Sequence, residues 1–237
     1  MRCMLRLVFC TGTEPGKWFR RYRDSHAPDA LQTVDADDAA TVLLSGDADL
    51  ALMRLPDARI DESFHTVRLY EEAPGIAVPK DSVYAEVGQE VAPADVADEI
   101  VNYRIGPDAL VDVAAVRTAL QVVAANVGVA IAPRPLLKVL SKKQVVPLGF
   151  ADPTVARTKI ALVWRKDDDN DEIQDFVGVA KGRTKNSSRN SAPKRSASQK
   201  AKDKQARRAA SYKKGNKGAI PKPLSKRYKP SKQRKRR

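Results

Sequence analysis

The sequence predicts an α/β protein of two lobes, followed by a disordered basic tail. Three observations predict this fold class. Some short segments alternate apolar and polar residues, which predicts strands, and others repeat apolar residues at spacings of three and four, which predicts helices. The two kinds of segment follow one another up to about residue 182, as they do in sheets with crossover helices. Beyond this point the chain is almost entirely basic and polar.

Five elements are expected in the first part of the chain. Leu5, Leu7 and Phe9 alternate with other residues in the opening strand. Pro28 stops the first helix, because the residue before a proline is pushed out of the helical conformation. The expected strands cover residues 5–9, 31–34 and 48–53, and the expected helices cover 17–25 and the stretch from the cap acids at 35–38 to about residue 46. This order predicts a parallel sheet with crossover helices.

The middle of the chain predicts a second set of strands and helices. Val113, Val116, Leu120, Val123 and Val127 recur at helical spacing and predict an amphipathic helix. The other expected helices cover residues 94–99, 135–141 and 169–182, and the expected strands cover 67–70, 75–78, 100–104, 129–132 and 158–164. Small-molecule sites in such folds lie at the carboxyl ends of strands and in clefts between lobes.

Several classes of protein are excluded by simple counts. A membrane span needs about 20 consecutive apolar residues, and the longest candidate, residues 122–132, is shorter and is interrupted by Asn126. The N-terminus lacks the apolar region and cleavage site of a secretory signal. The only cysteines, Cys3 and Cys10, cannot build a disulfide framework. We therefore expect a reducing, cytoplasmic location and no contact with a membrane.

The charge of the chain is divided sharply between its two parts. Residues 181–237 hold 23 Lys and Arg against one acid, a charge of +22, whereas residues 1–180 carry −8. A segment so poor in apolar residues cannot offset its ordering entropy, so it is expected to be disordered and to bind nucleic acid through phosphates without sequence preference. A merely solubilising extension is the alternative. The expected nucleic-acid contacts are Lys194, Arg195, Arg207, Arg208, Lys213, Lys214, Lys226, Arg227, Arg234, Lys235, Arg236 and Arg237.

Two segments carry a resemblance to a known family. Residues 46–52, followed by Arg54, join a glycine and an acid to a strand, and residues 123–133 read VAANVGVAIAP. In this order they resemble the effector-binding (substrate-binding) domain of LysR-type transcriptional regulators. Asn126 stands where the family usually has glycine. Family members normally begin with a winged helix-turn-helix, whereas the first strand expected here begins at Leu5, so we expect the usual DNA-reading module to be missing.

The resemblance implies a periplasmic-binding-protein-like fold of type 2, with two Rossmann-like lobes and an effector in the cleft between them. It covers roughly residues 4–182. The expected effector-binding domain is therefore residues 1–182, with lobe 1 at about 1–73 and 153–182 and lobe 2 at about 74–152, and the disordered tail is residues 183–237.

The turn after the opening strand is a candidate part of the effector site. Thr11, Gly12 and Thr13 lie where the strand meets the first helix, so their hydroxyls and the free helix amides could bind a carboxylate. The resemblance places effector contacts in the same turn. The alternative is that Thr13 merely caps the helix.

Arg54 ends the third strand at the carboxyl side of the sheet, where its guanidinium could make a paired contact with an anionic ligand. The alternative is a surface arginine paired with Asp57 or a neighbouring acid. In the second lobe, the resemblance implies four further effector contacts across the cleft. They are Tyr103, Gly106, Val127 and Gly128.

Catalytic and metal-binding signals are weak. The only histidines, His26 and His65, have no candidate nucleophile near them in sequence. The acidic run at 167–172 lacks the glycine and glutamate that a calcium loop requires, and the stretch from Gly12 to Lys17 is one residue short of a phosphate-binding loop. We therefore expect no enzyme, no metal and no cofactor.

The sequence as a whole favours a non-enzymatic domain that senses a small anionic metabolite, with a basic tail that binds nucleic acid and could bring the protein to the nucleoid or the ribosome. One alternative is an RNA- or ribosome-associated interaction protein that works through its tail. Another is a heteromeric partner of complete LysR-type regulators. A homodimer is also compatible with the sequence.

Overall fold

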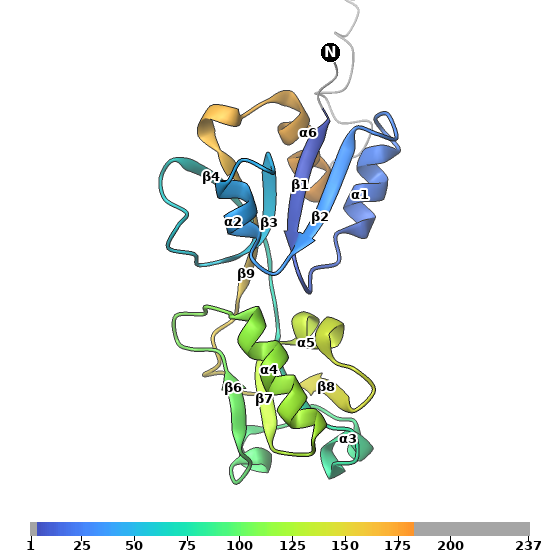
Figure 1. The fold of residues 1–237 in the computed structure, drawn as a ribbon, viewed down its shortest axis with the longest axis vertical. Coiled ribbons are helices and arrows are strands. Elements are labelled where there is room, and N and C mark those ends of the chain that lie inside the picture. The colour runs from blue at the N-terminus through green and yellow to red at the C-terminus, as the bar shows by residue number, and fades with distance from the viewer. Residues whose placement is uncertain (1–3, 183–237) are drawn as a thin grey trace, which may run out of the picture. The chain divides into compact units, whose positions relative to one another are not determined.

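The computed structural model describes residues 4–182, which form two separate β-sheets with helices packed against them (Figure 1). The first sheet has the strand order β2-β1-β3-β9-β4 and the second has the order β6-β7-β5-β8. We call the parts built on these sheets lobe 1 and lobe 2. The chain enters lobe 2 after β4 and returns to lobe 1 with β9. The predicted α/β class and two-lobed organisation are therefore confirmed.

Lobe 1 contains both parallel and antiparallel pairs. Its strands are β1 (Leu5–Cys10), β2 (Leu31–Ala36), β3 (Leu50–Leu55), β4 (Phe64–Glu71) and β9 (Lys159–Arg165), and its α-helices are α1 (Gly16–Arg23), α2 (Ala39–Leu44) and α6 (Asp171–Ala180). The β1 strand pairs in parallel with β2 and β3, as the strand–helix order predicts, whereas β9 runs antiparallel to β3 and β4. Leu7, Leu50, Ile160 and Phe176 are among the fully buried side chains of this lobe.

Lobe 2 has a core on each face of its sheet. Its strands are β5 (Pro74–Pro79), β6 (Val101–Arg104), β7 (Val129–Pro133) and β8 (Val145–Gly149), and its α-helices are α3 (Val83–Val87), α4 (Val113–Ala124) and α5 (Arg134–Leu140). The helices α4 and α5 cover one face, where Val116, Leu120 and Leu136 are buried, and Ile76 and Phe150 are buried on the other (Figure 1).

The structure corrects two expected elements of lobe 2 and adds two that were not expected. The helix expected over 94–99 is a short 3₁₀ turn, Pro93–Val96, because β6 already begins at Val101, five residues after this turn ends. The amphipathic helix α4 ends at Ala124 rather than 127, since Asn126 and Gly128 adopt left-handed φ angles of 65° and 61°. Neither α3 nor β8 is predicted by the sequence pattern.

Two further expectations concern a membrane span and the basic tail. Among the described residues, no helix is long and apolar enough to cross a membrane. The twelve predicted nucleic-acid contacts between Lys194 and Arg237 lie outside the described residues 4–182.

Candidate functional site

A cavity of about 540 Å³ lies between lobe 1 and lobe 2. We call it the interlobe cavity. Its charged lining residues are the carboxylates Asp37, Asp38, Asp57 and Asp112 and the guanidiniums Arg54 and Arg59. Its apolar lining includes Ala39, Met53, Pro56, Leu110 and Val113. It is an acidic site with an apolar wall.

The topology of lobe 1 explains why these residues meet. The strands β1, β2 and β3 are parallel, so their carboxyl ends lie at the same edge of the sheet. Cys10 ends β1, Asp37 directly follows β2, and Arg54 is near the end of β3; all three line the cavity. Lobe 2 contributes residues 109–114, the loop and first turn that begin α4.

Arg54 makes a buried ion pair with Glu72. Its Nε and Nη2 donate to the two carboxylate oxygens at 2.8 and 3.0 Å, and its Nη1 donates to the carbonyl of Thr11 at 2.9 Å. The Glu72 side chain is fully buried and also accepts a hydrogen bond of 2.6 Å from the Thr158 hydroxyl. The pair therefore joins β3 to both segments that connect the lobes, since Glu72 follows β4 and Thr158 precedes β9.

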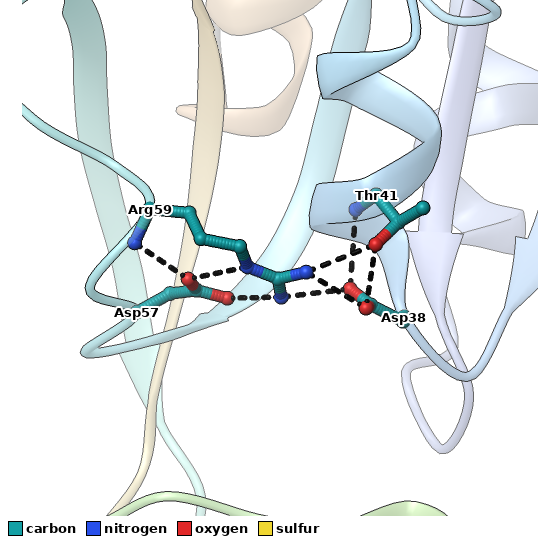
Figure 2. Close-up of polar contacts among 4 residues, drawn as sticks. All are labelled: Asp38, Thr41, Asp57 and Arg59. Carbon is teal, nitrogen blue, oxygen red and sulfur yellow. Dashed lines mark hydrogen bonds and ion pairs between the residues drawn. The ribbon is translucent and has the colours of Figure 1, made fainter.

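Arg59 joins the β3–β4 loop to the start of α2 (Figure 2). Its guanidinium donates to both oxygens of Asp38 at 2.8 Å, to Asp57 at 2.7 and 2.9 Å, and to the Thr41 hydroxyl at 2.9 Å. Asp38 also caps α2, because its Oδ1 accepts from the Thr41 amide at 3.1 Å. Hydrogen bonds from Arg59 hold the pKa of both Asp38 and Asp57 below its ordinary value, so both are ionised at neutral pH.

An ion pair bridges the two lobes directly. Arg117 on α4 donates to Asp37 through Nη2 at 2.9 Å and Nε at 3.2 Å. Asp37 also accepts from the hydroxyl of Thr11, at 2.7 Å. These hydrogen bonds, with that from Arg117 contributing most, lower the pKa of Asp37. The pair is about half exposed, so it is expected to hold the lobes together only weakly.

Asp112 caps α4 at the cavity. Its Oδ1 accepts from the Ala115 amide at 2.9 Å, and its own amide donates to the hydroxyl oxygen of Tyr103 at 3.1 Å. No ion pair to Asp112 exists among the described residues. It therefore presents a carboxylate to the cavity without a neutralising side chain.

The residues expected to bind an effector in lobe 1 are placed at or beside the cavity, but their polar groups are already engaged. Arg54 lines the cavity, and its partner is Glu72, so the expected alternative partner Asp57 is wrong. The Thr11 hydroxyl points at Asp35 and Asp37.

The remaining residues of this turn do not form the expected helix cap. The Thr13 hydroxyl donates to the Cys10 carbonyl at 2.7 Å, and α1 has Pro15 at its cap position without a side-chain hydrogen bond. The alternative in which Thr13 caps this helix is therefore wrong. Gly12 lies close to lobe 2, because a Cβ built on it would be 2.7 Å from the Leu136 Cα.

The four residues expected in lobe 2 are divided between two places. Tyr103 supports the cavity through its contact with the Asp112 amide. Gly106 lies three residues before the lining segment 109–114. Val127 and Gly128 follow the far end of α4 from Asp112 and do not line the cavity. None of the four residues therefore lines the cavity itself.

The sequence pattern does not assign four lining residues to this site, Asp37, Asp57, Arg59 and Asp112, nor Arg117, which pairs with one of them. A usable signal was present for two of them, since Asp37 belongs to the acids that follow the second strand and Asp112 directly precedes the amphipathic helix. Arg117 is 80 residues from its partner Asp37, so no local pattern links them.

Other chemistry is not supported in the described residues. Burial raises the pKa of the Cys10 thiol, which keeps it protonated at neutral pH. No group of three or more His, Cys, Asp or Glu side chains within residues 4–182 is arranged to hold a metal ion.

Solved structures share this architecture. The chain is 19% identical to the BenM effector-binding domain with its effector benzoate, at a TM-score of 0.58, over 75% of this chain and 90% of that one. An H2O2-bound mutant of OxyR from Corynebacterium glutamicum is 18% identical, with a TM-score of 0.53, covering 89% and 71%. Full-length CbnR complexed with its target DNA is 15% identical, with a TM-score of 0.55, covering 76% and 70%. No curated protein matches the chain in sequence.

Two connected α/β lobes with a cavity between them define the class of periplasmic-binding-protein-like folds of type 2. Within this class, residues 102–185 match the sequence model of the LysR substrate binding domain. The matched segment includes the second of the two sequence motifs, residues 123–133, so this part of the chain is similar to a LysR-type effector-binding domain.

Proposed function

We propose that residues 4–182 form a non-enzymatic sensor that binds a small molecule in the interlobe cavity. The observation that supports this proposal is the cavity itself, which has a volume of about 540 Å³ and is lined by residues of both lobes. Such a volume suits a small organic ligand. The BenM domain with benzoate and the H2O2-bound OxyR mutant have the same fold and bind small molecules. A ligand that contacts both lobes would stabilise their arrangement.

The expected anionic character of the effector has only one structural support. A second hollow of about 300 Å³ is lined by Arg134 and Lys138 of α5 together with Glu14 and Tyr70. Its formal charge balance is positive, whereas the larger interlobe cavity has four carboxylates and two guanidiniums. If the effector is an anion, this smaller hollow is the better place for it.

A substitution that fills the interlobe cavity should abolish sensing. Ala114 is exposed, lies in the first turn of α4 and lines the cavity, so Ala114→Trp adds bulk there without disturbing the core. A ligand from a metabolite library that raises the melting temperature of the full chain should no longer raise it in this variant, because stabilisation requires binding to the folded state. Thermal unfolding with and without ligand measures this effect.

The matched control is Thr118→Trp, one turn further along the exposed face of α4 and outside the cavity lining. It should keep the full ligand-induced shift. If the ligand raised the melting temperature of the unmodified chain, Ala114→Trp and Thr118→Trp equally, it would bind outside the interlobe cavity. If no compound in the library raised the melting temperature of the unmodified chain, the result would count against sensing altogether.

For the tail, we propose a separate role in nucleic-acid binding without sequence preference. Residues 186–237 contain 20 Lys and Arg and a single acid, Asp203. A polycation of this kind binds phosphates and releases counterions. The runner-up functions depend on the same segment or on a partner: an RNA- or ribosome-associated protein, or a companion of complete LysR-type regulators.

Deleting residues 186–237 should remove nucleic-acid binding. The full chain should bind duplex DNA and structured RNA with an affinity that falls by roughly a thousandfold between about 0.05 and 0.2 M salt. The chain that ends at Lys185 should not bind either, because its remaining charge is acidic. Fluorescence anisotropy over a salt series measures both. Tight binding of one sequence by the shortened chain would show that the α/β domain itself reads nucleic acid.

A further inference from the structure

We propose that the interlobe cavity selects a small organic cation, such as an amine or amidine with an apolar body, over an anion of the same size. This inference rests on the proposed function, because it names the chemical class of ligand for the same cavity. It reverses the charge expected from the sequence. Four observations on the lining of the cavity support it.

First, the formal charges of the lining are negative. Four carboxylates face two guanidiniums, and the partner of Arg54, Glu72, adds a further buried carboxylate beside them. Arg117 on α4 is not a lining residue, and its ion pair with Asp37 neutralises one carboxylate only. Within a cavity that has low-dielectric walls, an excess of one sign attracts the opposite charge.

Second, every nitrogen of both guanidiniums already donates at least one hydrogen bond. Arg54 uses its Nε, Nη1 and Nη2 on Glu72 and the Thr11 carbonyl. Arg59 uses the same three nitrogens on Asp57, Asp38 and Thr41. An anionic ligand that took over these donors would break charge-assisted hydrogen bonds, which are stronger than neutral ones.

Third, the two helices that begin at the cavity do not favour an anion. The N-terminus of a helix carries a partial charge of about +0.5, which would normally attract one. At α2 and α4 this charge is already met by the cap carboxylates Asp38 and Asp112, which accept from the amides of Thr41 and Ala115. Neither helix start therefore keeps an unmatched positive charge that would attract an anion, and at α4 the cap carboxylate has no ion-pair partner among residues 4–182.

Fourth, the remainder of the lining is apolar. Ala39, Met53 and Val113 are buried, and Pro56 and Leu110 complete the wall. Apolar surface of this kind favours a ligand with a hydrocarbon body. Its charged head would then lie against Asp112, the lining carboxylate that has no ion-pair partner among residues 4–182.

The test compares benzamidinium with benzoate, which share a ring and differ in the charge of the head group. Each is titrated into the full chain while the backbone amide resonances of residues 38–41 and 112–115 are followed by NMR. This local readout separates binding in the cavity from attraction of benzoate to the basic segment 181–237. Benzamidinium should shift these resonances at concentrations at least about tenfold lower than benzoate does.

The variant Asp112→Asn isolates the charge, since Asn caps a helix as well as Asp does. It should weaken benzamidinium about fivefold. The matched control Asp95→Asn removes one exposed carboxylate that bonds the Ala92 amide in lobe 2 outside the cavity, and it should leave the affinity unchanged.

Three results would overturn the inference. Benzoate could shift the cavity resonances at equal or lower concentration, which would leave small-molecule sensing intact and refute only the charge preference. Both aspartate variants could weaken benzamidinium equally, which would show a general effect of net charge. Neither probe could shift the cavity resonances; the melting experiments with Ala114→Trp would then decide separately whether the cavity senses any ligand.

Discussion

Replacing Glu72 by Gln is expected to destabilise the protein by roughly 3–5 kcal/mol, because it leaves the Arg54 guanidinium buried without its counter-charge. Arg54 is only 10% exposed in its side chain and Glu72 is 0% exposed, so water cannot take the place of the lost carboxylate. The substitution also removes the anionic acceptor of the Thr158 hydroxyl. Urea unfolding of the full chain, followed by circular dichroism, measures the loss.

The double variant Arg54→Met with Glu72→Leu shows whether the lost stability comes from the unpaired charge of Arg54 or from a general disruption of packing at this position. Removing both charges should recover most of the lost stability, since an apolar pair of similar volume is often as stable as a buried ion pair. Arg117→Gln is the exposed control, because it breaks an ion pair that is about half accessible and should cost no more than about 1 kcal/mol. A loss for Glu72→Gln as small as that of this control would mean that the buried pair contributes little.

Gly128→Ala should have a comparable effect through the backbone. Gly128 has a φ of +61°, and a Cβ at this position would lie 2.0 Å from the Ile100 carbonyl oxygen, so β6 or β7 must move. We expect a loss of roughly 3–5 kcal/mol, from the left-handed conformation together with the overlap. The midpoint of urea unfolding is the measurement.

Gly46→Ala is the matched control for conformation alone. Gly46 also has a positive φ, +80°, but no atom lies within 4 Å of a Cβ built on it. Its loss should therefore be limited to about 1–2 kcal/mol. If Gly128→Ala and Gly46→Ala are equally stable, the backbone at Ile100 moves away from the added Cβ without loss of stability, and steric overlap does not explain the effect.

Local patterns predicted most of the elements. The opening strand, the amphipathic helix and the returning strand appear within a few residues of their expected bounds, because alternation and helical spacing depend on neighbours along the chain. The left-handed φ of Asn126 explains how this residue stands in for the family's usual glycine. The β8 strand was missed because Pro147 interrupts its pattern; an edge strand tolerates a proline, and β8 lies at the edge of its sheet.

The residues of the site were predicted less completely. Arg54 and Thr11 were placed correctly at the carboxyl edge of the lobe 1 sheet, since the parallel strand order follows from the sequence pattern. Their partners were not predicted. Glu72 is 18 residues from Arg54, and it reaches Arg54 only because the strand that precedes it lies beside β9, which itself lies beside β3.

The amino-acid sequence thus establishes the α/β class, the family resemblance and the division of charge at about residue 181, because each of these depends on composition or on local order. The tertiary structure decides the electrostatic character of the cavity. Distant segments bring Glu72 to Arg54 and Asp38 to Arg59, and Asp112 reaches the cavity from the second lobe with no ion-pair partner among residues 4–182. Pairing of this kind depends on which strand ends and helix starts meet in space, and no pattern of neighbouring residues contains that information.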